Sequence, residues 1–202
     1  MALQFDSYPD IAYGTGSDLD LSIAERRQLW KWEAAVGYRI FAAMRWGQLG
    51  DGHITCRDPE HRDHFWMLSY GVPFREATVH DLILIGPDGS VVDGPAHATA
   101  NIAGYNIHHP LLEVRQDINA AAHTHTAFGT PWSANVEPFR AISQESCSFV
   151  FNQAMYEGED LEVDSTEGGY RIAEAMGANT LVILRNHGLL TGGLSPAEAV
   201  GW

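Results

Sequence analysis

The sequence predicts an α/β protein with a mainly antiparallel sheet, and three patterns support this fold class. Apolar residues recur at helical spacing over residues 22–46 and again over 165–176. Between residues 50 and 92, short apolar runs alternate with turn residues, which is typical of antiparallel strands. The chain has 202 residues, of which 45% are hydrophobic, so it can bury one sizeable core and a single domain is expected.

The first long helix is predicted by its start signal. Ser22 and Glu25 have the spacing of a capping box, in which the serine caps the helix and the glutamate reaches back. Gly47 is expected to end the helix. Residues 1–21 show no clear period, so we expect an irregular N-terminal arm and then one domain over 22–202. The apolar residues at helical intervals are Leu29, Val36, Ile40, Phe41 and Met44.

The next elements are predicted strands, each a short apolar run bounded by turn residues. They cover residues 53–57, 65–69 and 82–85. A turn is expected at 87–90, because its proline fixes one backbone dihedral and its glycine supplies another.

The second half of the chain alternates helices and strands. The predicted helices are 106–114, which has Pro110 near its start, and 165–176; the predicted strands are 118–122 and 180–184. Ser195 is expected to cap a last helix, with Pro196 at its first position. Only four residues follow Glu198, so this C-terminal helix is expected to be cut short.

Composition limits the classes of partner. The chain carries 26 acidic and 12 basic residues, a formal net charge of −14, which argues against nucleic acid and anionic lipid as partners. It contains no apolar run long enough for a membrane span and no signal-peptide pattern at its start. Cys56 and Cys147 are expected to be unpaired thiols in a reducing compartment. The sequence therefore predicts a cytoplasmic protein that acts on a small molecule.

Three of the ten histidines have spacing that suits a metal site. His123 and His125 end an apolar strand, where alternate residues point to the same face and can chelate one ion. His187 follows another apolar strand and precedes Gly188, where the chain can turn tightly. If the two strand ends are neighbours, three nitrogens converge and leave an open coordination position, as in catalytic zinc sites. The alternative for His187 is a capping histidine bonded to backbone.

The segments around these histidines resemble the class II aldolase/adducin family, and the resemblance runs from about residue 25 to the end. It rests on residues 115–126 (RQDINAAAHTHT), 182–188 (VILRNHG) and 52–57 (GHITCR). The resemblance implies a three-layer α/β/α domain around a central, mainly antiparallel mixed sheet. It also implies a divalent metal, zinc first and Fe²⁺ as the alternative, held by His123, His125 and His187. Family members are commonly homotetramers with active sites near subunit contacts.

Two departures set this chain apart from the family's sugar-phosphate aldolases. Those enzymes carry P-S-S-E before the histidine pair, and the position of the catalytic carboxylate is Gly104 here. The asparagine of their early G-N-x-S turn is His53. Residues 101–108 instead resemble the adducin-like branch, N-x-A-G-F-x-x-H, in its bacterial metal-binding type. A standard sugar-phosphate aldolase is therefore not expected.

Without a carboxylate at residue 104, other groups must do the acid–base work. The candidates are His53, His108, Glu145 and Tyr156. His108 either lines the site, provides a fourth nitrogen ligand, or is a core histidine bonded to backbone. Glu145 either lies on the surface or reaches the metal as the carboxylate of an iron-type triad. Phe128 and Trp132 closely follow the histidine pair and could wall a pocket for an aromatic substrate.

Three functions remain open from the sequence. The first is a metal-dependent lyase that cleaves a carbon–carbon bond of a small oxo- or hydroxy-acid, by retro-aldol cleavage or decarboxylation. The second, implied by the resemblance, is a non-haem iron oxygenase acting on an aromatic 2-oxo acid. The third is a non-catalytic, adducin-like binding module. Retention of a costly polar cluster argues against the third.

Overall fold

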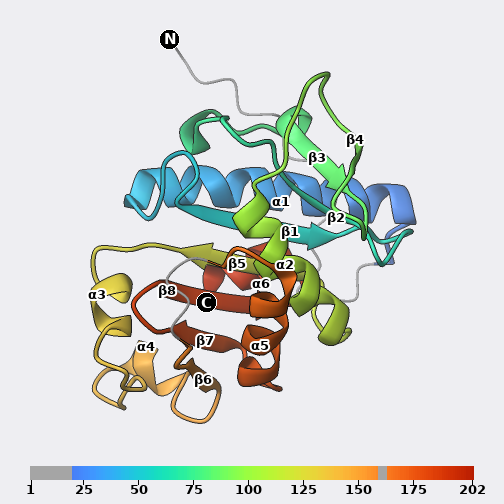
Figure 1. Ribbon diagram of the computed structural model, residues 1–202. Helices are drawn as coiled ribbons and strands as arrows, with labels where there is room; N and C mark the ends of the chain where they lie inside the picture. The colour runs from blue at the N-terminus through green and yellow to red at the C-terminus, as the bar shows by residue number, and fades with distance from the viewer. Residues whose placement is uncertain (1–19, 159–162) are drawn as a thin grey trace.

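The computed structural model describes residues 20–158 and 163–202 (Figure 1). Its helices are α1 (Ile23–Met44), α2 (Ile102–Val114), α3 (Gly129–Ser133), α4 (Gln144–Cys147), α5 (Thr166–Met176) and α6 (Pro196–Gly201), with short 3₁₀ turns η1 (Phe74–Glu76) and η2 (Val79–Asp81). Its strands are β1 (Gly52–Arg57), β2 (Phe65–Leu68), β3 (Leu82–Ile85), β4 (Val91–Asp93), β5 (Ala120–Thr124), β6 (Gln153–Tyr156), β7 (Leu181–Leu184) and β8 (Gly188–Gly193). The irregular arm expected over 1–21 lies almost wholly outside the described residues.

The strands form one eight-stranded sheet in the order β4-β3-β2-β1-β5-β8-β7-β6. Every neighbouring pair is antiparallel except β6 and β7, which run parallel. The sheet is therefore mixed but mainly antiparallel, which confirms the expected class. The order also makes β5 and β8 neighbours, with Thr124 opposite Leu189, although 63 residues of the sequence lie between the end of β5 and the start of β8.

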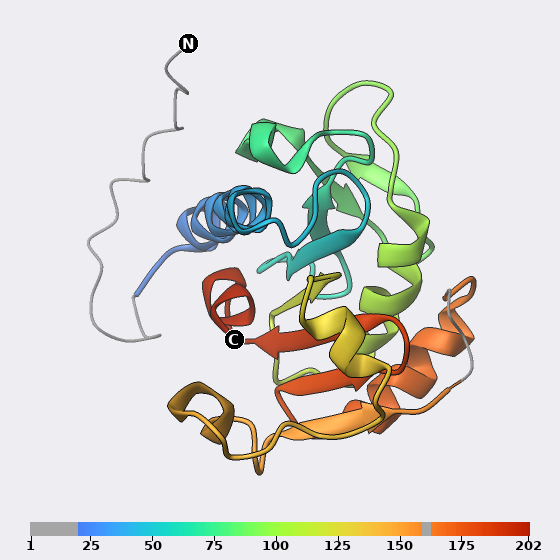
Figure 2. The same ribbon diagram turned by 90° about the vertical axis from the view of Figure 1, so that its left-hand side faces the viewer.

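Helices cover both faces of the sheet, so the fold has three layers (Figure 2). Successive side chains of each strand point to opposite faces of the sheet, so the buried residues form two separate cores, one on each face. Ile54 and Cys56 of β1 belong to the core under α1 and α6. Met67 of β2 and Ala121 of β5 belong to the core under α2 and α5. Because the side chains of a strand alternate between its faces, His53 and Thr55 of β1 and Ala121 and His123 of β5 lie on the face that α2 covers.

Helix α1 begins where its capping signal predicts. The Ser22 hydroxyl accepts the Glu25 N–H at 3.3 Å, and the Glu25 carboxylate accepts the Ser22 N–H at 2.9 Å. The helix ends at Met44, before the expected stop at Gly47, because Arg45 adopts the left-handed conformation with φ of 60°. Its amide still bonds back to the Ala42 carbonyl, in the manner of a helix C-cap.

Helix α2 begins at Ile102, four residues before the expected 106. The side chain of Asn101 caps it by accepting the Gly104 N–H at 3.1 Å. Pro110 consequently lies inside the helix rather than near its start, which corrects the prediction. A proline there cannot donate to the carbonyl of residue 106. Gly169 of α5 approaches that carbonyl so closely that a Cβ on residue 169 would lie 2.0 Å from the oxygen.

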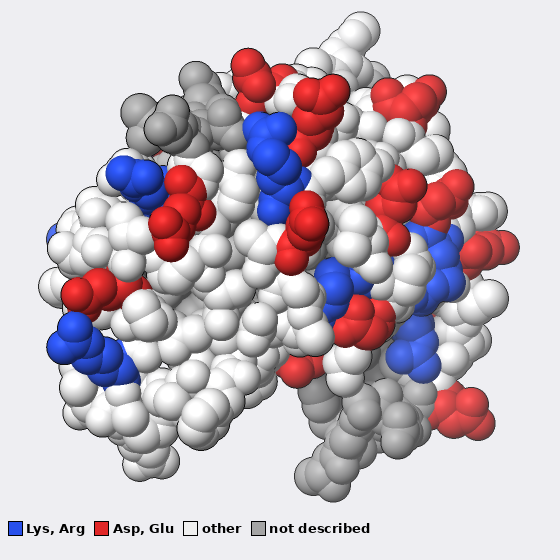
Figure 3. Space-filling view, turned by 60° about the horizontal axis from the view of Figure 1, so that its bottom comes forward, with Lys and Arg blue, Asp and Glu red and all other residues white. Residues whose placement is uncertain are grey.

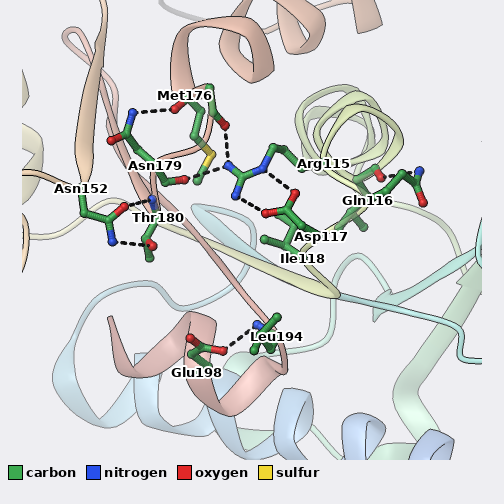
Figure 4. Close-up of polar contacts among 12 residues, drawn as sticks. Arg115, Gln116, Asp117, Ile118, Asn152, Met176, Asn179, Thr180, Leu194 and Glu198 are labelled. Atoms are coloured by element: carbon green, nitrogen blue, oxygen red, sulfur yellow. Dashed lines mark hydrogen bonds and ion pairs between the residues drawn. The ribbon is translucent and has the colours of Figure 1, made fainter. Parts of the chain in front are cut away.

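A buried arginine joins the loop before β5 to the loop before β7 (Figure 4). The Arg115 guanidinium pairs with Asp117 at 2.7 and 2.8 Å. It also donates to the carbonyls of Gly177 and Asn179 at 2.6 and 2.8 Å. The loop before β5 and the loop before β7 are thereby held together, which helps to fix the positions of the strand ends that follow.

The other predicted elements agree with their sequence signals or move by one or two residues, whereas α3, α4, β4, β6 and β8 were not predicted. Strand β5 starts and ends two residues later than the expected 118–122, so that it includes His123. Ser165 occupies the cap position of α5 but makes no side-chain cap bond, whereas Ser195 caps α6 through the Glu198 N–H at 3.2 Å. None of the helices in the described ranges is both long and apolar enough to cross a membrane. On the face drawn in Figure 3, acidic and basic side chains are interspersed and form no continuous basic surface.

Candidate metal centre

Three histidines converge at one end of the sheet. His123 is the fourth residue of β5, His125 follows that strand, and His187 lies in the turn between β7 and β8. Their ring centroids are 4.8 Å apart in every pair, and the rings are close to mutually perpendicular, at 80°, 85° and 87°. The Nε2 atoms of His123 and His125 are 2.9 Å apart. One nitrogen from each ring therefore faces a common point.

A backbone carbonyl orients the most buried of the three. Nδ1 of His123 lies 2.8 Å from the Leu189 carbonyl oxygen. A carbonyl only accepts, so Nδ1 must carry the proton and Nε2 keeps its lone pair toward the other two rings. This is the arrangement that metal-bound histidines usually have, with the second ring nitrogen fixed by an acceptor.

The turn that presents His187 is tight. The His187 amide donates to the Leu184 carbonyl at 3.0 Å, and Asn186 takes the left-handed conformation with φ of 58°. The sequence suggested that the chain turns at Gly188. The residue that takes the left-handed conformation is instead Asn186. Glycine is needed at 188 for a different reason, because a Cβ there would lie 2.5 Å from the Thr124 carbonyl oxygen of β5. The missing side chain lets β8 approach β5 beside the histidines.

The histidines of this cluster are kept neutral. Burial lowers the pKa of His187 to about 4, and the neighbouring His125 adds to the effect. Burial also holds the pKa of His123 well below its usual value, with His53, His187 and His125 contributing. The pKa of His125 is lowered by burial too. Neutral imidazole is the form that binds a metal, so the site does not have to lose protons near neutral pH before it can bind.

The donor set fits a divalent transition metal. Within the described ranges, the cluster of possible metal-ligand atoms at this place consists of histidines alone, with all atoms within 4.8 Å of one another. Because Nε2 of His123 keeps its lone pair, the 2.9 Å contact to Nε2 of His125 is either a hydrogen bond donated by His125 or, with a cation between them, two lone pairs that face the same ion. Imidazole nitrogens suit zinc and iron equally, so the chemistry of the donors does not choose between them.

A second pair of histidines lies behind the first. His53 of β1 is directly opposite His123 of β5 in the strand register, and their ring centroids are 4.8 Å apart. Nδ1 of His53 lies 2.9 Å from Nε2 of His108, and Nδ1 of His108 lies 2.7 Å from the Thr55 hydroxyl oxygen. Both ring nitrogens of His108 are thus engaged by side chains. His108 therefore has no free nitrogen to serve as a fourth metal ligand. It is also not a core histidine bonded to backbone, because both of its partners are side chains.

Gly104 adjoins His53 directly. A Cβ on residue 104 would lie 3.0 and 3.1 Å from Cγ and Cδ2 of the His53 ring, and 2.8 Å from Cε of Met67. The space next to residue 104 is therefore already filled by the imidazole of His53. Burial, followed by the neighbouring His108, holds the pKa of His53 well below its usual value.

The other predicted site residues lie apart from the histidines within the chain. Phe128, Trp132 and Glu145 line a cavity of about 600 Å³, and none of the three converging histidines lines it. The cavity also touches Ala122 and Thr124, which alternate with His123 along β5 and so point to the opposite face. Glu145 is exposed, at the rim of this cavity.

Tyr156 ends β6, at the far edge of the sheet from β5, and packs in the core beneath α2 and α5. Its hydroxyl accepts a hydrogen bond from Nε of Arg171 at 3.3 Å. The structure thus brings together His53, His108 and the three converging histidines, and leaves Tyr156 outside that group.

Sequence reasoning missed two members of the site. Thr55 follows His53 by two residues, so the period of a strand could have placed both side chains on one face. The Leu189 carbonyl had no such signal, because the pairing of β5 with β8 is a tertiary event.

Comparisons with known proteins find relatives in sequence and in fold. The family model for the class II aldolase and adducin N-terminal domain matches residues 33–202. The solved structure of L-fuculose 1-phosphate aldolase from Glaciozyma antarctica PI12 superposes with a TM-score of 0.83 and is 33% identical, covering 91% of this chain and 71% of that one.

Two curated bacterial relatives are also similar. The 4-hydroxy-3-prenylphenylpyruvate oxygenase/4-hydroxy-3-prenylbenzoate synthase of Streptomyces roseochromogenus subsp. oscitans is 34% identical over 181 residues, which are 89% of this chain and 65% of that protein. The decarboxylase NovR of Streptomyces niveus is also 34% identical over 181 residues, which are 89% of this chain and 66% of that protein. The chain thus spans slightly less than two thirds of each relative. With the family model covering most of its length, the chain belongs to the class II aldolase and adducin N-terminal domain family.

Proposed function

We propose that this chain is a metal-dependent lyase domain that cleaves a carbon–carbon bond next to a carbonyl group in a small oxo- or hydroxy-acid. The observation that carries the proposal is the convergence of His123, His125 and His187 on one point with neutral rings. Three neutral ligands leave a divalent ion its full charge and an open position, which is the composition of a catalytic site. Retro-aldol cleavage and decarboxylation both fit this reaction class.

A divalent ion held there would act as a Lewis acid toward a carbonyl or carboxylate oxygen of the substrate. The chain itself supplies the ligands, the Leu189 carbonyl that orients His123, and the paired imidazoles of His53 and His108 beside them. Gly104 contributes no acid or base, and His53 fills the adjoining space. Two supports for lyase chemistry are a relative named as a decarboxylase and membership of the class II aldolase family.

A second candidate is a non-haem iron oxygenase that acts on an aromatic 2-oxo acid. It is favoured by the relative named as an oxygenase of a prenylated phenylpyruvate, and by the suitability of histidine for iron. Under either reading we also expect a zinc or iron cofactor, a homotetramer and a cytoplasmic location, and we propose these together with the function.

The test compares protein loaded with Zn²⁺ and with Fe²⁺, each under argon and in air. The substrates are phenylpyruvate, a 4-hydroxy-2-oxo acid and L-fuculose 1-phosphate, and both product and oxygen uptake are measured. Lyase activity gives cleavage of an oxo-acid without oxygen uptake. Oxygen uptake in step with product would establish the oxygenase instead.

Two further outcomes of this experiment would contradict the proposal. Metal-loaded protein that turns over none of the oxo-acids would favour a binding module. Turnover of L-fuculose 1-phosphate at an ordinary enzymatic rate, about 1–10 per second, would show that the site works as a sugar-phosphate aldolase despite Gly104.

A further inference from the structure

We propose that His53 is a hydrogen-bond donor of the active site, fixed as the neutral tautomer with its proton on Nε2 by Thr55 and His108. The inference rests on the proposed function of the three-histidine centre, because His53 adjoins that centre through His123. It goes further by assigning the direction of each hydrogen bond in the chain of side chains behind the centre.

The direction of the hydrogen bonds is set first at Thr55, which is completely buried. A hydroxyl has one proton to donate, and a buried donor left without an acceptor costs free energy. Within the described part of the protein, the one side-chain hydrogen bond of Thr55 is to Nδ1 of His108, at 2.7 Å. Thr55 therefore donates, and Nδ1 of His108 accepts with its lone pair.

The second hydrogen bond, from His108 to His53, takes its direction from the tautomer of His108, which is also completely buried. No described carboxylate forms an ion pair with His108 or His53, so neither ring has a counter-ion that would stabilise a second proton. A neutral His108 that accepts at Nδ1 carries its proton on Nε2. That N–H donates to Nδ1 of His53 across 2.9 Å. His53, accepting at Nδ1, must in turn carry its own proton on Nε2.

Nε2 of His53 is the end of this chain. It makes no hydrogen bond to any described residue, and it is not one of the fully buried polar atoms that lack a partner. The ring cannot readily rotate away, because Gly104 and Met67 lie against one side and His108 holds Nδ1. The N–H is therefore held in place, and although His53 is only 4% exposed, its Nε2 lies at the part of the ring that is not fully enclosed, where a substrate oxygen would have to meet it.

A fixed neutral N–H suits one chemical task. It can donate to a carbonyl or carboxylate oxygen of an oxo-acid while negative charge builds up on that oxygen, and it needs no reorganisation to do so. It cannot accept a proton at Nε2, so this arrangement makes His53 a donor rather than a base. His53 is then the catalytic residue, and His108 and Thr55 are positioning residues.

The direct test is long-range ¹H–¹⁵N NMR of the imidazole rings in the full chain, without substrate, in metal-free and Zn²⁺-loaded protein. We expect His53 to be protonated on Nε2 alone in both forms. Thr55→Val removes the donor while keeping the shape, and should leave His53 as a mixture of tautomers. Thr55→Ser keeps the hydroxyl and should restore the Nε2 form. A proton on Nδ1 of His53 in the wild type would overturn the inference.

The activity arm separates this inference from the function itself. His53→Phe should lower kcat by about 100-fold with a smaller change in KM and with normal metal content, which is the usual effect of losing one such donor. Unchanged kcat in this variant would overturn the inference while leaving the lyase intact. If His53 has the Nε2 proton but no oxo-acid is turned over, the proposed function fails while the tautomer assignment stands.

Discussion

At the scale of single residues, Gly104 determines where His53 can lie. The imidazole occupies the space that a side chain at 104 would need, since a Cβ there would come within 3.0 Å of the ring. The ring cannot yield without losing the 2.9 Å hydrogen bond to His108. A missing side chain on α2 and a large one on β1 are therefore complementary, and neither can change alone.

Gly104→Ala tests this complementarity. The new methyl group would overlap the His53 ring and the Met67 terminus, and overpacking of this kind costs about 1–3 kcal/mol of unfolding free energy. We expect a loss of that size in urea unfolding, together with loss of the His53 tautomer signal described above.

The matched control for that variant is Gly201→Ala, where an added Cβ meets nothing within 4 Å. Alanine is favoured over glycine in a helix, so the control should be neutral or slightly stabilising, by less than about 1 kcal/mol. Equal stability of the two variants would show that His53 and Met67 adjust freely around residue 104.

The lowered pKa values predict how the metal-free protein responds to acid. His187 has a folded pKa of about 4, below its unfolded value of about 6.5, so the unfolded chain binds more protons between those values. The free energy of unfolding should therefore fall as the pH decreases from about 6.5 toward about 4. Urea unfolding in EDTA at intervals over this range measures it.

His187→Gln serves as the comparison for the acid response, because it removes one of the titrating rings. Its unfolding free energy should depend less steeply on pH in the same window. A wild-type free energy that stays constant, or that rises on acidification between pH 6.5 and 4.5, would contradict the assignment of neutral buried rings.

At the scale of elements, the sequence predicted well where the signal is local. The capping box at Ser22 and the helical spacing behind it correctly placed α1. The strands β1, β2 and β3 also lie where short apolar runs indicated. Strand β8, by contrast, was not predicted. Three of its six residues are glycines, which strands normally avoid; β5 approaches the first closely, α6 approaches the last, and Ile118 packs against the one between.

The candidate site also has parts that a local sequence pattern predicts and parts that depend on tertiary packing. The histidine spacing on β5 and in the β7–β8 turn predicted that three rings could converge, because a strand's period alone sets which face they share. His108 was a candidate for the site, but its bonds to His53 and Thr55 could not be predicted, since they depend on which face of α2 packs against β1. Phe128 was a candidate wall of the site, and Glu145 was expected either at the surface or at the metal; within the chain, the alternation along β5 places the cavity that both residues line on the other face.

Arg115 provides a test of how elements are joined. Arg115→Met removes the pair with Asp117 and two bonds to backbone carbonyls, and should cost about 2–3 kcal/mol of unfolding free energy. Arg75→Met is the control, because Arg75 pairs with Glu76 at the exposed surface, where such a pair contributes less than about 1 kcal/mol. Similar losses in both variants would contradict the bridging role of Arg115.

At the scale of the whole molecule, the two faces of the sheet carry different features. The three histidines and the His53–His108 pair lie on the face covered by α2, whereas the aromatic-lined cavity lies on the face of α1 and α6. Phe128, Ile142 and Phe151, in the segment that includes α3 and α4, are 88%, 79% and 98% exposed. Apolar side chains so exposed in one segment indicate a surface that associates with another molecule.

We therefore expect the chain to self-associate, with a tetramer as the expected form. Light scattering coupled to gel filtration at micromolar concentration measures the mass. Phe151→Ser should shift the mass toward the monomer, whereas Tyr70→Ser, at an exposed aromatic residue on another segment, should not. A monomeric mass for the wild type would contradict the expectation.

The central claim is that one metal ion is held by three histidines, and the metal content of purified variants tests it most directly. Elemental analysis should find about one zinc or iron per wild-type chain. His123→Ala, His125→Ala and His187→Ala should each lose most of it, because each removes one of three ligands. His80→Ala, at an exposed histidine outside the cluster, should keep the wild-type content. A His187→Ala protein that keeps its metal would contradict the three-histidine centre.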